Sequence, residues 1–386
     1  MRDLEAELRE LADRGLLRQR RCLESAQGTG VEVDGRHFLS FASNDYLGLA
    51  ADPRLVEALI DGARHYGVGA GASHLIVGHH RAHHALEERL AAFTGFARAL
   101  LFGSGYAANL AIVSLLARNG AELFADRLNH ASLNDAMRLS RARFHRYAHL
   151  DLAALSRLLE ASSAVRRVVL TDSVFSMDGD LAPLDHLARL CERHGAWLVV
   201  DDAHGFGVLG PQGRGAAAHF GLDAERTVYM GTLGKAAGVS GAFVAAPAAV
   251  IDSLIQQARP YVYSTASPPA LAHALLRSIE LIETEQWRRD HLDRLIARLK
   301  DRLAGLRWPL LASLTAIQPL MVGDPRAATT LAAQLSAQGI LVPAIRPPTV
   351  PAGSARLRIS LSAAHRPEEV DELAAALMRA REAGNE

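Results

Sequence analysis

Lys235 is the residue with the clearest chemical potential, and it lies in the turn Thr232-Leu233-Gly234-Lys235-Ala236. The 386-residue sequence contains only two lysines, Lys235 and Lys300, although lysine and arginine together number 42. Arginine keeps its proton in proteins, whereas a desolvated lysine can become a neutral amine nucleophile. An apolar, glycine-rich turn therefore makes Lys235 a candidate for Schiff-base chemistry. The alternative is an ordinary lysine in a surface turn.

Several other reactive or turn-forming residues come directly after a predicted strand. Ligands of open α/β sheets bind beyond the carboxyl ends of the strands, so a single site could collect these residues. Taken singly, Asp201 could cap a strand and His204 could be an ordinary loop histidine. The residues at strand ends are Gly105, His130, Ser176, Asp201, His204 and Lys235.

The turn Gly103-Ser104-Gly105-Tyr106-Ala107-Ala108-Asn109 joins a predicted strand to a predicted helix. Such a turn presents backbone N–H groups to an anion, most often phosphate. It could also be the dinucleotide turn of a nicotinamide oxidoreductase. That class expects an acidic residue ~20 positions later, which Asp126 fits only loosely, and it leaves Lys235 unexplained. A non-catalytic binding protein is a third option, disfavoured by the full set of reactive residues.

Four histidines, His79, His80, His83 and His84, open a predicted helix that runs to Phe93. Their spacing could place ligands on one helix face, but the H-E-x-x-H arrangement is absent and no acidic ligand is obvious nearby. The sequence therefore predicts no metal site. The two cysteines, Cys22 and Cys191, have no motif spacing, which indicates a reducing compartment without disulfides.

Strands and helices alternate between residues 99 and 245, which predicts a mainly parallel sheet flanked by helices. Strands and helices alternate again within residues 310–386, over a shorter stretch, which predicts a second, smaller α/β domain. An amphipathic helix is expected over residues 1–22, ending in an arginine cluster, and a hairpin follows it. The expected division is an N-terminal segment at 1–45, a large domain at 46–285 and a small C-terminal domain at 286–386.

The composition is that of a globular protein in water. Hydrophobic residues make up 49% of the chain, charged residues 22%, and the formal net charge is zero. No basic stripe points to nucleic acid. No signal peptide is evident, and no run approaches the ~18 apolar residues of a membrane span. These features predict a cytoplasmic location with no membrane or nucleic-acid partner.

A phosphate turn, a strand-end aspartate, a histidine three residues later and a desolvated lysine match what pyridoxal 5′-phosphate (PLP) needs. The lysine would form a Schiff base with the cofactor. The aspartate would keep the pyridine nitrogen protonated, so that the ring accepts electrons. The residues themselves therefore favour a PLP enzyme.

The sequence resembles the α-oxoamine synthases, which are PLP enzymes of the aspartate aminotransferase fold (fold type I). The resemblance covers nearly the whole chain and implies a large domain with a mainly parallel seven-stranded sheet and a smaller C-terminal α/β domain. The matching stretches are Ser43–Leu49, Gly103–Asn109, Asp126–Ser132, Val174–Asp180, Asp201–Gly205 and Thr232–Lys235.

The resemblance also implies roles for the cofactor site. Lys235 would carry PLP and then abstract the α-proton of the amino acid. Asp201 would pair with the pyridine nitrogen, His204 and Ser176 would reach the ring hydroxyl, and His130 would stack on the ring. The phosphate would be held by Ser104, Gly105, Tyr106 and Thr232. Ser264 and Thr265 would reach the phosphate of a neighbouring subunit, which implies a homodimer with shared sites.

The implied reaction joins an amino acid to an acyl thioester with loss of carbon dioxide. The stretches Ala344–Gly353 and Ala355–Arg358 are most similar to those of the synthases that use L-alanine and a pimeloyl group carried by CoA or acyl carrier protein. Glycine C-acetyltransferase, 5-aminolevulinate synthase and serine palmitoyltransferase are the nearest alternatives.

Four residues are expected to bind these substrates. Arg358 and Asn44 would hold the carboxylate of the amino acid. Thr349 and an N-terminal arginine would contact the acyl substrate. Aligning back from Gln27-Gly28 favours Arg20 as that arginine, and a small gap would move the assignment to Arg18 or Arg21.

Overall fold

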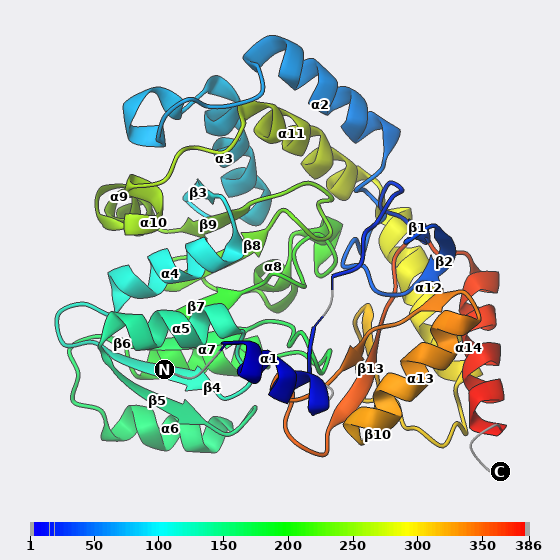
Figure 1. Ribbon diagram of the computed structural model, residues 1–386. Coiled ribbons are helices and arrows are strands. Elements are labelled where there is room, and N and C mark those ends of the chain that lie inside the picture. Colours follow the sequence, from blue (N-terminus) through cyan, green and yellow to red (C-terminus); the bar gives the residue numbers. More distant parts are fainter. Residues whose placement is uncertain (1–3, 15, 19, 383–386) are drawn as a thin grey trace. The chain divides into compact units, whose positions relative to one another are not determined.

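The structure is a computed structural model, and it describes residues 4–14, 16–18 and 20–382 (Figure 1). The chain divides into two compact units. The first comprises residues 1–46, 177–180 and 290–386, and the second comprises residues 47–176 and 181–289. The short segment 177–180 was not separated from its neighbours by the sequence. The expected boundaries at 45 and 285 stay predictions, and the contact division falls at 46 and 289.

The larger unit is built on a seven-stranded sheet of order β3-β9-β8-β7-β6-β4-β5. All the strand pairs from β8 to β5 are parallel, and only β9 runs antiparallel to both of its neighbours. This confirms the predicted, mainly parallel sheet of seven strands. The strands are β3 (Arg98–Phe102), β4 (Glu122–Asp126), β5 (Arg143–Tyr147), β6 (Arg167–Asp172), β7 (Trp197–Asp201), β8 (Thr227–Thr232) and β9 (Ala242–Ala246).

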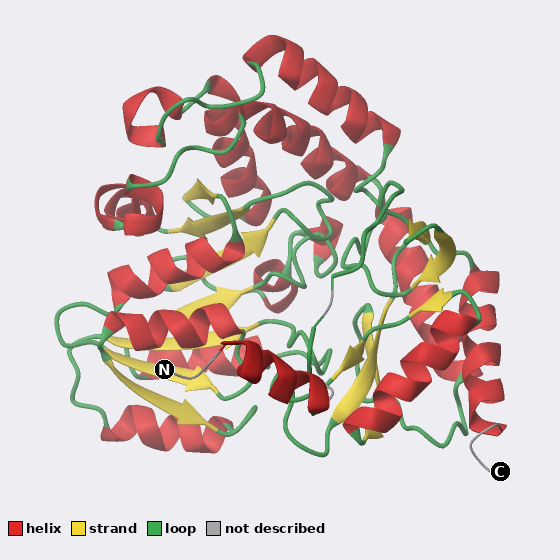
Figure 2. Cartoon of the chain, viewed as in Figure 1, coloured by secondary structure: helices red, strands yellow, loops and turns green. Residues whose placement is uncertain are grey.

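Helices cover both faces of this sheet, as Figure 2 shows. Side chains alternate between the faces along each strand, as the pleat requires. Val168 and Leu170 of β6 lie in the core beneath α4 and α5, whereas Val169 lies in the core beneath α6 and α7. The helices of this unit are α2 (Pro53–Tyr66), η1 (His74–Gly78), α3 (Arg81–Thr94), α4 (Gly105–Leu116), α5 (Ala131–Ser140), α6 (Leu152–Ala161), α7 (Leu184–Arg193), η2 (Pro211–Gly213), α8 (Ala216–Phe220), α9 (Ala248–Gln257), α10 (Arg259–Val262) and α11 (Pro269–Thr284).

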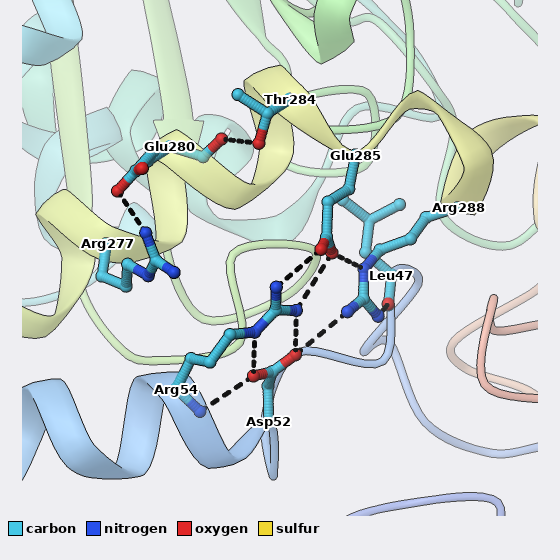
Figure 3. Close-up of polar contacts among 8 residues, drawn as sticks. All are labelled: Leu47, Asp52, Arg54, Arg277, Glu280, Thr284, Glu285 and Arg288. Carbon is cyan, nitrogen blue, oxygen red and sulfur yellow. Dashed lines mark hydrogen bonds and ion pairs between the residues drawn. The ribbon is translucent and has the colours of Figure 1, made fainter.

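A cluster of ion pairs joins the start of α2 to the region after α11 (Figure 3). Arg54 donates to Asp52 Oδ2 at 2.8 Å and to Glu285 Oε1 at 2.6 Å. Arg288 donates to the same Asp52 oxygen at 3.0 Å and to the Leu47 carbonyl at 2.6 Å. These bonds lower the pKa of Asp52 to about 2, the bond from Arg54 being the largest cause. The entry into α2 is thus fixed by charge-assisted hydrogen bonds.

The smaller unit contains two three-stranded sheets, of order β1-β2-β11 and β10-β13-β12. Strand β11 pairs in parallel with β2, so residues about 300 positions apart share a sheet. The elements are α1 (Leu4–Asp13), β1 (Gly30–Val33), β2 (Arg36–Ser40), β10 (Ile317–Gly323), α13 (Pro325–Ala337), β11 (Ile340–Leu341), β12 (Ala344–Ile345), β13 (Ala355–Ser360) and α14 (Pro367–Glu382). Helix α12 (Gln286–Arg302) begins in the larger unit and continues into the smaller one.

Two sequence expectations about helices were wrong. The N-terminal helix ends at Asp13, so the arginines that follow lie in irregular chain instead of at a helix end. The helix expected to open at His79 begins instead at Arg81, with His80 as its N-cap. Residues 74–78 before it form a separate short helical turn, η1.

Candidate active site

A cavity of about 200 Å³ opens at the carboxyl ends of the central strands of the larger unit. The parallel strands β4, β6, β7 and β8 all end at this edge, so residues distant in sequence meet there. The lining residues are Gly105, Tyr106, His130, Ser132, Asp172, Asp201, Ala203, His204, Met230, Thr232 and Lys235. Seven residues chosen from the sequence therefore share one cavity.

Lys235 lies against His204 in this cavity, with 2.9 Å between Lys235 Nζ and His204 Nε2. The tight turn after β8 fixes the lysine: Gly238 N–H donates to the Lys235 carbonyl at 2.8 Å. Gly238 has φ +71°, and a Cβ at that position would lie 2.7 Å from the backbone nitrogen of Ala50. The turn therefore requires glycine, and it holds the lysine amine beside an imidazole that can share its proton.

Asp201 is almost wholly buried at the end of β7, and fixed donors hold both of its oxygens. Ala203 N–H donates to Oδ1 at 3.0 Å, and Asn109 Nδ2 donates to Oδ2 at 2.7 Å. The same amide nitrogen donates to Ser132 Oγ at 2.8 Å. Asn109 is itself fully buried, so these bonds are not exchanged for water. The carboxylate is thus oriented by α4 and by the second residue after β7.

The hydrogen-bond chain continues to His130, the N-cap of α5. Ser132 N–H donates to His130 Nδ1 at 3.3 Å, and Ser132 Oγ lies 2.7 Å from the same nitrogen. Because an N–H donor can only meet a lone pair, the neutral ring carries its proton on Nε2. One chain of hydrogen bonds therefore joins Asp201 to His130 and sets the orientation of both.

Asp172 is a second buried carboxyl group at the cavity, and the sequence reasoning gave it no role. Burial is the largest cause that raises its pKa well above the usual range, and the charge of Asp201 adds to the effect. Its Oδ1 accepts from the His130 backbone N–H at 3.1 Å. Asp172 pairs with Asp201 in the register of β6 and β7, so two carboxyls meet at the ends of neighbouring strands.

Asn109 and Ser132 were also missed as functional residues, although both stand inside motifs that the sequence singled out. The available signal was position: Asn109 faces inward from the first turns of α4, and Ser132 follows the histidine at the start of α5. Neither spacing reveals that the two side chains meet beside Asp201 at the end of β7. Only the fold brings them together.

The N-terminus of α4 forms one end of the cavity. Ser104 caps this helix by accepting from Ala107 N–H at 3.2 Å, and Gly105 and Tyr106 begin it. Thr232, the last residue of β8, also lines the cavity, and its hydroxyl donates to the Gly241 carbonyl at 3.1 Å. Free N–H groups of a helix start, together with the helix dipole, suit an anion such as phosphate.

The remaining cofactor candidates lie outside the lining of this cavity. Ser104, Ser176, Ser264 and Thr265 are not among its lining residues. Ser264 and Thr265 are exposed, and Thr265 pairs with Ser73 in an isolated antiparallel bridge. Their predicted roles stay predictions.

The predicted substrate residues lie in the smaller unit. Arg358 on β13 is buried and donates to Asn44 Oδ1 at 3.1 Å and to Ser360 Oγ at 2.8 Å. The structure therefore brings the two expected carboxylate ligands together. Arg18 Nη2 donates to Thr349 Oγ1 at 3.2 Å, so Arg18 is the N-terminal arginine that contacts Thr349.

A second cavity of the larger unit has a volume of about 290 Å³ and lies between α7 and the chain around α8. Its lining includes Arg189, Cys191 and Arg226, but no lysine or histidine. Burial raises the pKa of Cys191 to about 12, so its thiol is inert at neutral pH. Because Lys235 and the His204 imidazole lie together in the cavity of about 200 Å³, we place the active site there.

The donor set of that smaller cavity fits PLP. An amine stands beside a base, a buried carboxylate is held by donors, and a helix N-terminus is available for the phosphate. Lys235, Asp201 and the start of α4 would hold the cofactor by its aldehyde carbon, ring nitrogen and phosphate, respectively.

Comparisons with known proteins agree with this chemistry. Residues 36–377 match the family described as aminotransferase class I and II. The 8-amino-7-oxononanoate synthase of Nitrosomonas europaea is 61% identical over 378 residues, which cover 97% of this chain and 98% of that protein. The chain belongs to the 8-amino-7-oxononanoate synthase family. Within the part of the chain that the structure describes, no helix is long and apolar enough to cross a membrane.

Solved structures share the fold. An SPT structure with PLP superposes with a TM-score of 0.93 at 29% identity, covering 98% of this chain and 97% of that one. An 8-amino-7-oxononanoate synthase from Francisella tularensis superposes with a TM-score of 0.79 at 31% identity, covering 90% and 99% of the two chains. The predicted fold type I architecture is confirmed.

Proposed function

We propose that the protein condenses L-alanine with a pimeloyl thioester to give 8-amino-7-oxononanoate, carbon dioxide and the free carrier. This reaction is a step of biotin biosynthesis. The observation that carries the proposal is the near-full-length identity of 61% to a protein of that name, together with a cavity that unites Lys235, His204 and Asp201. PLP, when bound, acts as an electron sink for the α-carbon of the amino acid.

The proton of that α-carbon is the part of the reaction that the chain itself must handle. We assign Lys235 as the base, because its amine lines the cavity and lies within hydrogen-bond reach of a second group that can carry a proton. His204 Nε2, at 2.9 Å, shares the proton and keeps the amine oriented. Asp201, fixed by Asn109, would keep the cofactor ring protonated.

The remaining cavity residues position the cofactor. The backbone N–H groups at the start of α4 would bind its phosphate, and the Thr232 hydroxyl would join them by turning its proton from the Gly241 carbonyl to the phosphate. His130 would face the ring, since it lines the cavity, and its hydrogen bonds with Asp172 and Ser132 hold it there. We assign Arg358 and Asn44 to the carboxylate of L-alanine, and Thr349 with Arg18 to the acyl substrate. Arg20, favoured by the sequence, is the alternative to Arg18.

The decisive assay combines purified holoenzyme, L-alanine and pimeloyl-CoA, with mass detection of the product and thiol detection of free CoA. Pimeloyl-acyl carrier protein in a parallel reaction identifies the carrier. Glycine with acetyl-CoA and glycine with succinyl-CoA are the controls for the related synthases. Product from glycine but not from L-alanine would refute the proposed substrate while leaving the PLP chemistry intact.

We also propose that the protein is a homodimer in which each subunit completes its neighbour's cofactor site through Ser264 and Thr265. Both side chains are exposed and lie outside the cavity of their own subunit. Exposed apolar side chains accompany them: Tyr263 is 72% exposed, and Ile76 and Val77 are 74% and 76% exposed. The bridge between Ser73 and Thr265 joins the two segments, and an exposed apolar area of this kind marks an association surface.

Mixing two inactive or weakened variants tests this arrangement. Consider a hybrid dimer of one Lys235→Ala subunit and one Thr265→Ala subunit. If Thr265 acts across the interface, the site on the Thr265→Ala subunit has its own native Lys235 and receives the native Thr265 of the other subunit, so that one site is intact. Mixing at limiting PLP should then raise activity above that of either variant alone. If Thr265 served its own subunit, neither site of the hybrid would be intact, and mixing would produce no gain.

A further inference from the structure

Three histidines gather at η1 and the start of α3, outside the lining of the cofactor cavity. Their ring centroids lie 5.2 Å apart for His74 and His79, 5.0 Å for His74 and His83, and 5.8 Å for His79 and His83. One nitrogen from each ring lies within 4.8 Å of the other two. The proposed reaction uses none of the three.

The backbone of η1 is what brings His74 and His79 together. Gly78 N–H donates to the Ser73 carbonyl at 3.0 Å, which closes a wide turn with a five-residue step. Residues five positions apart therefore lie on the same side of the turn. A Cβ at position 78 would stand 2.1 Å from the Ala72 carbonyl oxygen, so only glycine allows this turn. Local geometry is thus specialised to hold the pair.

The ring nitrogens of the cluster converge on one another. His74 Nδ1 and His79 Nδ1 are 2.9 Å apart, so at most one of them carries a proton. His83 Nε2 lies 2.8 Å from the Ser267 carbonyl, to which it donates, and this leaves the lone pair on Nδ1. The His80 backbone N–H points at that lone pair from 3.1 Å. A backbone carbonyl that accepts the distal N–H is the usual support for a metal-bound histidine.

Burial disfavours the charged form of these rings, and the neutral form is the one that binds a metal. Burial is the largest cause that lowers the pKa of His74 and of His83 to about 4, with neighbouring histidines adding to it. The pKa of His79 is lowered as well, again mainly by burial. Glu87 is the acidic residue beside the cluster, with Oε2 3.9 Å from His79 Nε2.

We propose that His74, His79 and His83 bind one divalent transition-metal ion with the ligand preference of zinc. Imidazole nitrogens suit zinc and its neighbours far better than magnesium or calcium. Zinc–nitrogen bonds of about 2.0–2.1 Å need ligand nitrogens about 3.4 Å apart, which small ring rotations reach from the observed separations. Binding at His83 Nδ1 replaces the hydrogen bond from His80, and three ligands leave a fourth position for water.

The ion would pin η1 to the first turn of α3. His74 also stacks on Tyr261 of α10, with ring centroids 5.0 Å apart and planes 9° from parallel. A metal at this point would therefore link η1 to α3 beside a ring that packs on α10. We expect its effect in the stability of this corner of the larger unit.

Cobalt(II) is the probe, because its visible bands report coordination by nitrogen ligands. Titration of the holoenzyme should reach one ion per chain, and His74→Asn should weaken binding at least about tenfold. His84→Asn is the matched control: His84 neighbours His79 and Glu87 in an alternative ligand group but is outside the proposed triad. His186→Asn, far along the chain on α7, controls for binding by surface histidines.

The binding results for these variants distinguish the proposed site from the alternative ligand group. Binding lost in His74→Asn and kept in both controls supports the site. Binding lost in His84→Asn but kept in His74→Asn would overturn it in favour of the alternative group. Absence of binding below millimolar cobalt would overturn it outright. Zinc should also raise the Tm of the native protein and not that of His74→Asn, since a ligand that binds the folded state adds stability that grows with the logarithm of its concentration divided by Kd.

Discussion

Replacing Asn109 by leucine removes the donor that orients Asp201 while preserving the volume of the side chain. Asn109 Nδ2 gives Asp201 Oδ2 a bond of 2.7 Å and gives Ser132 Oγ a bond of 2.8 Å, both in a fully buried place. A hydrogen bond to a charged group contributes about 1.5–3 kcal/mol. At about 1.4 kcal/mol for each factor of ten, kcat/KM for L-alanine should fall between about 10-fold and 100-fold.

Steady-state kinetics at saturating pimeloyl thioester would measure this loss, and the visible absorbance of lysine-bound PLP would measure cofactor affinity. Gln318→Leu is the matched control, because it removes another buried amide, one that donates to the Thr315 carbonyl at 2.6 Å on β10. That variant should lose stability but retain cofactor affinity. A folded Asn109→Leu protein with kcat/KM within threefold of the native value would contradict the orienting role.

Four further predictions concern the site and the fold. Lys235→Arg keeps the charge but cannot lose its proton, so turnover and the visible absorbance of bound PLP should both vanish; normal turnover would sink the assignment of the base. Arg358→Lys should raise KM for L-alanine at least about tenfold through loss of the planar guanidinium, with the KM for the thioester unchanged. Asp52→Asn should destabilise the protein by on the order of 2 kcal/mol at neutral pH, because the lowered pKa of Asp52 contributes stability above about pH 4. This contribution disappears as pH falls through about 2, so the unfolding curves of the native protein and the variant should converge in acid. Gly238→Ala should lower stability by at least about 1 kcal/mol in denaturant titrations, because φ is +71° and the space is filled; an unchanged midpoint would argue against the strained turn.

The sheet could be predicted from the sequence because each strand is marked by its own run of apolar residues. Runs such as Val168–Leu170 and Leu198–Val200 are buried on both faces, and their apolar character is continuous as parallel strands require. The strand-end rule then placed Asp201, His204 and Lys235 at one edge without any knowledge of packing. Family resemblance supplied the roles that position alone left open.

The polar residues that support the site were beyond this reasoning. Asn109 and Ser132 meet because α4 and α5 lie side by side on the sheet, a contact between helices that no local pattern encodes. The same holds for His74, which stands outside the histidine run and joins it only through the five-residue turn at Gly78. Helix ends were also misjudged where a cap decides the boundary, as at His80.

The small unit is assembled from three separate pieces of sequence, and this has a consequence for synthesis on the ribosome. Strand β2 emerges early but finds its partner β11 only after about 300 further residues have been made. Meanwhile residues 47–289 supply every strand of the large sheet and can fold as they appear. The edge of β2 therefore stays unpaired during this time, and an unpaired strand edge is a template for incorrect pairing.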